Sequence, residues 1–83
     1  MKIRVWVAEV WDNLEMDVGG DHTFAQVKVD GLQRAMDGGA DPDEYEMKFR
    51  GALVRDESQT LEAAGVPDGA PMIILASARR PVT

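Results

Sequence analysis

The sequence predicts an α+β fold in which one helix packs on one sheet, with elements in the order β-β-α-β-β-(short helix)-β. Three observations lead to this prediction. Apolar and polar residues alternate along the first 18 positions, a capped helical segment follows, and short apolar segments separated by glycine and proline turns fill the rest. A chain of 83 residues has room for one hydrophobic core, so a single domain is expected.

The first part of the chain predicts a β-hairpin. Residues 1–7 and 14–18 alternate with period two and are rich in β-branched side chains, which is typical of half-buried strands. The inward-facing set is Met1, Ile3, Val5, Val7, Leu14, Met16 and Val18. Lys2, Arg4 and Trp6 occupy the opposite face of the first strand. Asp12 and Asn13 have turn chemistry, so the hairpin turn is expected there.

The next segment, residues 24–37, predicts the long helix. Thr23 and Gln26 have the spacing of a capping box, and Gly38-Gly39 supplies a stop. The apolar side of this helix comprises Phe24, Val27, Leu32, Ala35 and Met36. Lys28 falls near the middle of that side and Gly31 weakens the interior, so the stretch FAQVKV also fits a strand on local grounds.

The second half consists of short segments between turn residues. The expected elements are strands over residues 46–49, 52–56 and 72–75, and one capped helical turn over residues 58–66. An acidic loop with a proline break, residues 40–45, precedes them.

The order of these elements and many residues in them resemble ubiquitin and its β-grasp relatives. MKIRV is similar to the family's first strand and HTFAQVK to its helix start. The densest likeness is MKFRGALVRDESQTLEAAGVPDGAPMIIL, with a Phe-x-Gly turn, a short strand ending in Asp, a Thr-Leu pair and a final strand. The matching positions are Phe49, Gly51, Val54, Asp56, Thr60, Leu61, Val66 and Gly69.

The resemblance runs from Met1 to about Leu75 and refines the expected fold. It favours a helix over residues 24–37, with a small insertion near Gly31. It also implies a mixed sheet whose first and last strands are adjacent and parallel at the centre. We therefore expect a ubiquitin-like β-grasp domain over residues 1–76 and a short flexible tail over residues 77–83.

Composition excludes several classes of function. Nine basic and fifteen acidic residues give a net charge of −6, which opposes nucleic-acid binding because phosphates attract cationic surfaces. The apolar runs are far shorter than the ~20 residues that span a bilayer, and the start lacks the apolar region of a signal peptide. We expect no membrane insertion and a cytoplasmic protein, or a piece of a longer one.

Residues suited to catalysis are few and scattered. His22 is the only histidine, and the absence of cysteine excludes disulfides and thiolate zinc sites. Ser58 and Ser77 have no basic partner nearby in the sequence, so no nucleophilic constellation emerges. We expect neither enzymatic activity nor a cofactor.

The acidic residues after the helix form the one group that suggests a cation. They are Asp37, Asp41, Asp43 and Glu44. A calcium loop needs ligands at alternate positions around a central glycine, and Pro42 restricts the chain where such a loop must bend. A solvated acidic loop without a metal is the better interpretation.

The segment after the last strand bears on the modifier function that the resemblance raises. Ubiquitin and the sulfur carriers act through a C-terminal Gly-Gly. Here ASARRPVT follows the last strand, and the Gly-Gly pairs at 19–20 and 38–39 are internal. A conjugated modifier or sulfur carrier is therefore the less favoured alternative.

The other mode of action common in the family is an exposed sheet face that partners bind. Alternation places Arg4, Trp6, Lys48, Ile73 and Leu75 on that face. An exposed Trp beside aliphatic residues and a cation is a plausible docking surface, although Trp6 could instead lie flat under Lys48 or Arg4. Trp11, in the hairpin turn, either inserts into a partner or folds back over the sheet edge.

The expected function is therefore protein interaction without catalysis. The resemblance implies two settings for a small β-grasp protein without Gly-Gly: the ubiquitin-like accessory protein of bacterial type VII secretion and the small subunit of multicomponent bacterial monooxygenases. A composition rich in Ala, Gly, Asp and Arg suggests a high-GC bacterial gene, which favours the secretion component.

Overall fold

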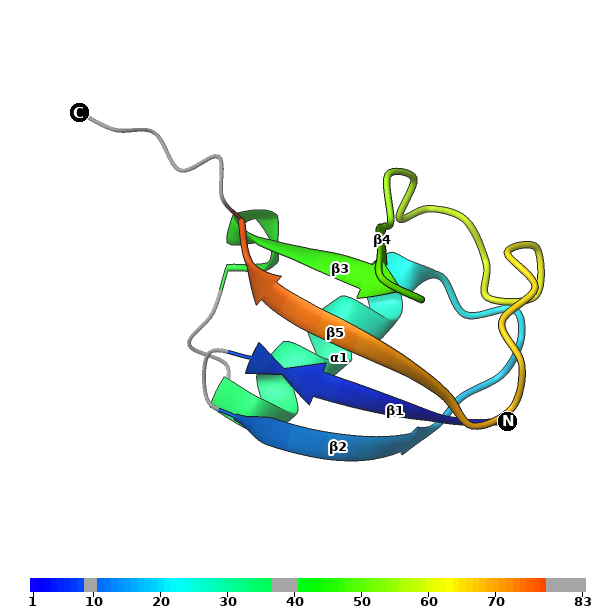
Figure 1. The fold of residues 1–83 in the computed structure, drawn as a ribbon, viewed down its shortest axis with the longest axis horizontal. Coiled ribbons are helices and arrows are strands. Elements are labelled where there is room, and N and C mark those ends of the chain that lie inside the picture. The colour runs from blue at the N-terminus through cyan, green and yellow to red at the C-terminus, as the bar shows by residue number, and fades with distance from the viewer. Residues whose placement is uncertain (9–10, 37–40, 78–83) are drawn as a thin grey trace.

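The computed structural model describes residues 1–8, 11–36 and 41–77, and in them one helix crosses one face of a single sheet (Figure 1). The elements are β1 (Lys2–Val7), β2 (Asp12–Asp17), α1 (Phe24–Met36), the 3-10 helix η2 (Pro42–Glu44), β3 (Tyr45–Phe49), β4 (Ala52–Leu53) and β5 (Ala70–Ala76). This arrangement confirms the predicted α+β fold.

The five strands lie in the order β2-β1-β5-β3-β4. β1 and β5, from opposite ends of the chain, run parallel at the centre, and the remaining neighbours are antiparallel. The mixed sheet with parallel central strands is as the resemblance implied.

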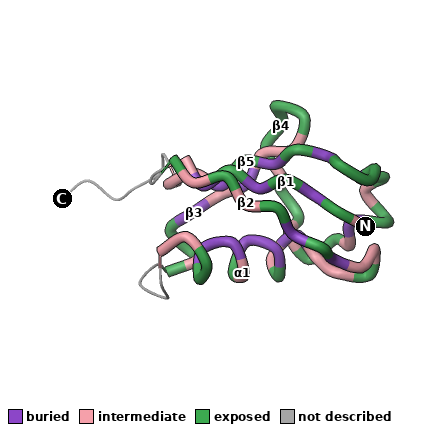
Figure 2. Tube along the Cα trace, turned by 90° about the horizontal axis from the view of Figure 1, so that it is seen from below, coloured by how far each residue is buried: buried purple, intermediate pink, exposed green. Residues whose placement is uncertain are grey.

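The core fills the space between the sheet and α1 (Figure 2). β1 alternates exposed and buried along its whole length, and β5 does so over its first five residues. The fully buried large side chains are Phe24, Ile3, Met16, Leu32, Met47, Leu61, Met72, Ile74, Val5, Val7 and Val27. Each contributes about 1.5–3 kcal/mol relative to an exposed position, so this apolar layer holds the helix on the sheet.

α1 begins with the predicted capping box. Gln26 donates its backbone N–H to Thr23 Oγ1 (3.2 Å), while Gln26 Oε1 accepts from the Thr23 N–H (2.8 Å). Two otherwise unpaired N–H groups are thereby satisfied, which is why the helix begins here and the strand alternative is wrong. The helix runs without a break through Gly31, which is buried against β1 and β5.

The hairpin turn lies earlier than predicted. Asp12 and Asn13 belong to β2, where they pair with Val7 and Trp6. The chain reverses just before them, and Trp11 donates its backbone N–H to the Ala8 oxygen (3.3 Å). Pairing therefore continues to the last residue of β1, and it outweighs the local turn preference of Asp-Asn.

Two other local predictions need correction. Residues 58–65 form successive turns and a short bridge to the helix start, without an assigned helix. Thr60 does cap the expected turn, since its Oγ1 accepts from the Ala63 N–H (3.1 Å). In the expected acidic loop, η2 forms because Asp41 Oδ1 accepts from the Asp43 N–H (3.0 Å).

The last described residue, Ser77, lies beside η2. It donates its backbone N–H to the Glu44 oxygen (2.8 Å), so the chain still contacts the rest of the fold at that residue. The rest of the expected tail, residues 78–83, lies outside the described residues, as do Asp37 and the Gly38-Gly39 stop.

Candidate interaction surface

A line of outward-facing residues crosses the whole sheet. Strand register places Trp6 opposite both Asn13 of β2 and Ile73 of β5. Ile73 in turn lies opposite Lys48 of β3, which lies opposite Leu53 of β4. Directly opposite residues share a face of the sheet, so these side chains are neighbours. We call Trp6, Ile73, Lys48 and Leu53 the cross-sheet row.

The cross-sheet row is exposed and largely apolar. Trp6 is 42% exposed, Leu53 42% and Ile73 39%, and Lys48 is partly buried between its two aliphatic neighbours. Register thus brings together three of the residues that the sequence analysis selected, although they come from three different strands.

The other two selected residues flank this row. Arg4 is exposed and lies opposite Pro71 and Glu15, while Leu75 is partly buried and lies opposite Glu46. All five residues therefore share the outer face, on the side of the sheet away from α1. Their role in binding a partner stays a prediction.

Trp11 enlarges this surface. Its ring centroid lies 5.8 Å from that of Trp6, with the two ring planes tilted by 58°. Trp11 folds back toward the sheet and still remains 79% exposed, so both indole rings present area to solvent. Its φ of +55° is a left-handed conformation, which a bulky residue rarely adopts.

The Trp6 ring is not shielded by a cation. Among the described residues, the cation–π contact joins Arg50 to Phe49, at 5.1 Å from the ring centroid. The alternative in which Lys48 or Arg4 covers Trp6 therefore does not hold in this arrangement. Trp6 packs against another exposed aromatic ring instead.

Two of the cations on the outer face, Arg4 and Lys48, are free to pair with another molecule. Within the described part of the chain, neither the Arg4 nor the Lys48 side chain forms a hydrogen bond or ion pair, even though Glu15 lies opposite Arg4. The face thus combines apolar area with two available positive charges.

Leu53 was missed by the sequence analysis. β4 contains only Ala52 and Leu53, and two residues are too few to show an alternating pattern. The available signal was the Phe-x-Gly turn, because a tight turn at Gly51 folds Leu53 back beside Lys48.

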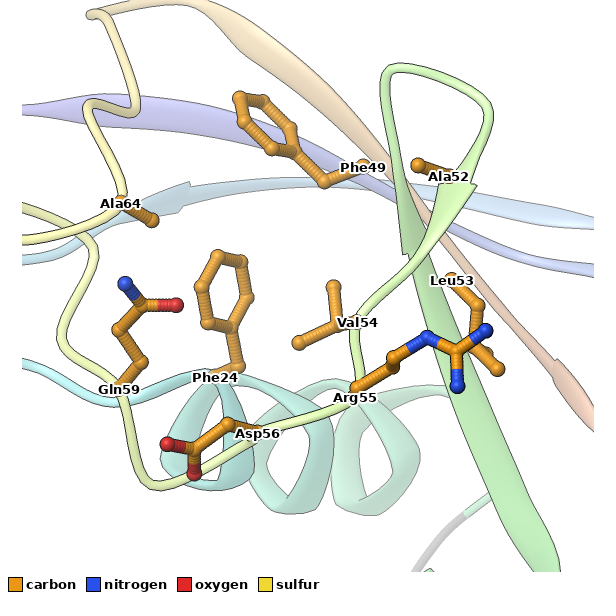
Figure 3. A pocket seen from close by; sticks show the side chains of 9 residues that line it. All are labelled: Phe24, Phe49, Ala52, Leu53, Val54, Arg55, Asp56, Gln59 and Ala64. Carbon is orange, nitrogen blue, oxygen red and sulfur yellow. The ribbon is translucent and has the colours of Figure 1, made fainter.

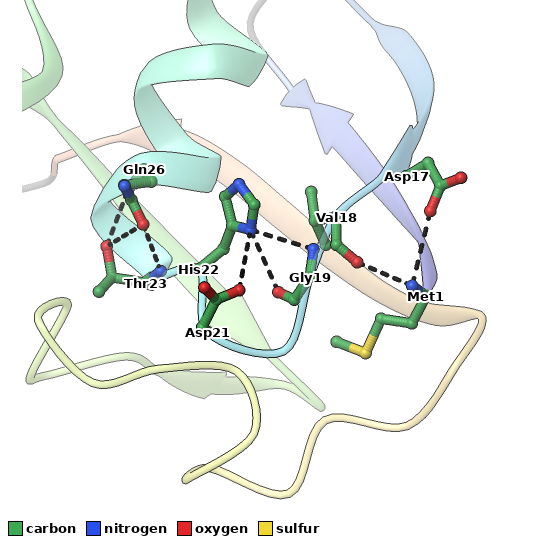
Figure 4. A network of polar contacts seen from close by, with 8 residues as sticks. All are labelled: Met1, Asp17, Val18, Gly19, Asp21, His22, Thr23 and Gln26. Carbon is green, nitrogen blue, oxygen red and sulfur yellow. Dashed lines mark hydrogen bonds and ion pairs between the residues drawn. The ribbon is translucent and has the colours of Figure 1, made fainter.

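Two polar residues considered for catalysis, His22 and Ser58, have structural partners. His22 Nδ1 accepts the Gly19 N–H (3.0 Å) in the corner before α1, where the Met1 nitrogen also donates to the Val18 oxygen (2.7 Å; Figure 4). Ser58 donates its hydroxyl to Asp56. Among the described residues no three His, Asp or Glu side chains gather closely enough to hold a metal ion.

No helix within residues 1–8, 11–36 and 41–77 combines the length and apolarity that crossing a bilayer requires.

One helix packed on a five-stranded mixed sheet with parallel central strands defines a ubiquitin-like β-grasp domain. The solved structure of Caldiarchaeum subterraneum ubiquitin is similar over 99% of this chain and 95% of that chain, with a TM-score of 0.80 and 25% sequence identity. No protein-family model and no curated protein matches the chain. The predicted ubiquitin-like fold is confirmed, and proteins with it usually serve as modifiers or interaction domains.

Proposed function

We propose that this protein is a non-catalytic interaction module that binds a partner protein through its outer sheet face. The observation that carries the proposal is the exposed Trp6–Trp11 pair at one end of the cross-sheet row. Tryptophan is enriched among the residues that dominate binding energy, and clustered exposed apolar side chains mark interaction sites. The strained backbone of Trp11 supports the same proposal, since strain often accompanies function.

The chemistry of the face defines the partner that fits it. Apolar side chains of the partner would cover Trp6 and Ile73, while a carboxylate would pair with Lys48 or Arg4. Because the chain carries a net charge of −6, its long-range field repels an acidic partner. The two cations would act at short range and set the orientation of binding.

More specifically, we propose that the protein is an accessory component of a bacterial multiprotein system in the cytoplasm. A type VII secretion system is the favoured setting, and a role as the small subunit of a multicomponent monooxygenase is the alternative. We propose that it acts without conjugation, since residues 77–83, which follow β5, contain no glycine. Incubation with ATP and a ubiquitin-type activating enzyme tests this point. A C-terminal adenylate or thioester would contradict it.

Partner capture from the native host tests the main proposal. Tagged wild type, Trp6→Ala and Val29→Ala are compared by pull-down and mass spectrometry. Val29 is a matched control, because it is 37% exposed on the helix side of the molecule. We expect a partner that Trp6→Ala loses and Val29→Ala retains, with all three proteins folded by circular dichroism. Equal capture by the three would refute the assignment, and the partner's identity separates the two bacterial settings.

A further inference from the structure

A recess lies at the end of the sheet, between β4, the start of α1 and the loop that follows β4 (Figure 3). Its volume is about 320 Å³. We propose that it binds an extended segment of a partner protein through one bulky aliphatic side chain and an adjacent carboxylate. This site is additional to the cross-sheet row, and only Leu53 borders both.

The floor of the recess is apolar. It is formed by the rings of Phe24 and Phe49, whose centroids lie 6.3 Å apart, together with Val54 and Ala64. Phe24 is fully buried by the core, while the other three side chains are only partly covered. A branched aliphatic side chain placed here would bury area that is now exposed to water, and each buried methylene contributes about 0.8 kcal/mol.

The charge at the rim selects the neighbouring group. Arg55 is exposed and makes no hydrogen bond or ion pair among the described residues. The carboxylate of Asp56 is already engaged, since its Oδ1 accepts both the N–H and the hydroxyl of Ser58. Asp56 keeps its negative charge, but Arg55 is the cation of the lining, and its unpaired guanidinium complements a carboxylate beside the aliphatic anchor.

The walls of the recess are held in place before any ligand arrives. Backbone N–H groups of Phe24 and Ala25 donate to the oxygens of Gln59 (3.2 Å) and Glu57 (2.9 Å). Lys28 Nζ also lies 2.6 Å from Glu57 Oε1, which fixes the loop to α1. Such preorganisation lowers the entropic cost of binding.

The form of the recess favours a peptide over a small molecule. Small-molecule sites enclose most of their ligand. Here Ala52, Leu53, Arg55, Asp56 and Gln59 are all exposed, so the recess is open along its rim. Figure 3 shows Gln59 and Arg55 on opposite sides of the apolar floor, where the Gln59 amide is available to a peptide backbone. A single side chain of a longer segment suits this shape.

Short blocked peptides test the inference by NMR titration of the whole chain. Three peptides differ only at two adjacent central positions, which are Leu-Asp, Leu-Asn or Ala-Asp. We expect Leu-Asp to shift the amides of Val54, Gln59 and Ala64, and to bind about three- to tenfold more tightly than the other two. The Arg55→Gln variant should bind Leu-Asp and Leu-Asn equally. The control variant Lys48→Gln, which removes a cation of the cross-sheet row instead, should still prefer Leu-Asp to Leu-Asn.

Several outcomes would overturn the inference. These are a Leu-Asp preference that survives Arg55→Gln, shifts confined to Trp6 and Ile73, or binding of N-acetyl-leucine as tight as that of the peptide. Shifts that depend on protein concentration without peptide would identify a second copy as the occupant and also refute it. Trp6→Ala should bind the peptides normally, so failure here is distinguishable from failure of the proposed sheet-face function.

Discussion

Lys28 Nζ lies 2.6 Å from Glu57 Oε1 and 3.0 Å from the backbone oxygen of Tyr45. A cation that falls on the apolar side of α1, and is only 6% exposed, thus joins the helix to β3 and to the loop after β4. Burial of this charge is tolerated because both partners are within hydrogen-bonding distance. Lys28, which interrupts the apolar pattern of the helix, therefore links three segments of the chain.

Removing one member of this pair should destabilise the domain. Glu57→Gln leaves the buried ammonium without its counter-charge, and we expect the free energy of unfolding to fall by about 2–4 kcal/mol. The lower part of that range applies because the Glu57 side chain is 24% exposed. Urea denaturation measures the change. Lys28→Met removes the buried charge itself, so it should lower the free energy of unfolding by less than Glu57→Gln does. A larger loss for Lys28→Met than for Glu57→Gln would contradict this explanation.

Gly31 sets the closest approach of α1 to the sheet. A Cβ built there would lie 2.9 Å from Ile74 Cδ1 and 3.4 Å from Val5 Cγ1. For Gly31→Ala, a gain in helix propensity of about 1 kcal/mol opposes overpacking of similar size, so we expect a net change within about 1 kcal/mol.

A double-mutant cycle isolates this contact. Ile74→Val removes the obstructing methyl group and should destabilise Gly31→Ala less than it destabilises wild type. Additive unfolding free energies for the two substitutions would show that Gly31 and Ile74 do not compete for space. Gly31→Val, with two further methyl groups, should lose more than 1 kcal/mol by the same measurement.

The exposed residue Trp11 has a left-handed backbone conformation. Glycine adopts a φ of +55° without strain and alanine does not. Both substitutions remove the contact with Trp6, so their difference reports the backbone alone. We expect Trp11→Gly to be about 1 kcal/mol more stable than Trp11→Ala in thermal or urea unfolding. Equal stabilities would indicate that the turn relaxes to another conformation.

The capping box at the start of α1 should contribute measurably. Thr23→Ala removes the Oγ1 acceptor of the Gln26 N–H, and we expect a loss of about 1 kcal/mol in the free energy of unfolding. Thr23→Ser retains the acceptor and serves as the control. If the serine variant loses as much as the alanine variant, the methyl group of Thr23 matters more than the cap.

Local sequence patterns predicted the long helix and the strands, but they predicted the boundaries of these elements poorly. The predicted alternation of residues 1–7 appears as a strictly alternating burial in β1, and the predicted cap marks the first residue of α1. The prediction of a turn at Asp12-Asn13 was wrong because pairing with β1 continues through both residues. The helical turn predicted over residues 58–66 is replaced by successive turns, in which Gly65 adopts a φ of +75°.

The candidate surface was predictable only in part. Alternation within each strand placed Trp6, Lys48 and Ile73 on the outer face, because successive side chains point to opposite sides of a sheet. It could not show that these residues stand opposite one another. A slip of two residues between strands leaves every side chain on the same face, so the row depends on the register of distant strands.

The sequence by itself determined which side of β1, β2, β3 and β5 is buried and where the helix begins, since these follow from short-range periodicity and capping. Tertiary structure alone decided that Leu53 completes the row, that Trp11 contacts Trp6 and that Lys28 meets Glu57. Each of these contacts joins segments that are separate in the sequence. Whether those segments meet depends on how β1, β3, β4 and β5 assemble. Such contacts are set by packing of the whole chain, which no local pattern encodes.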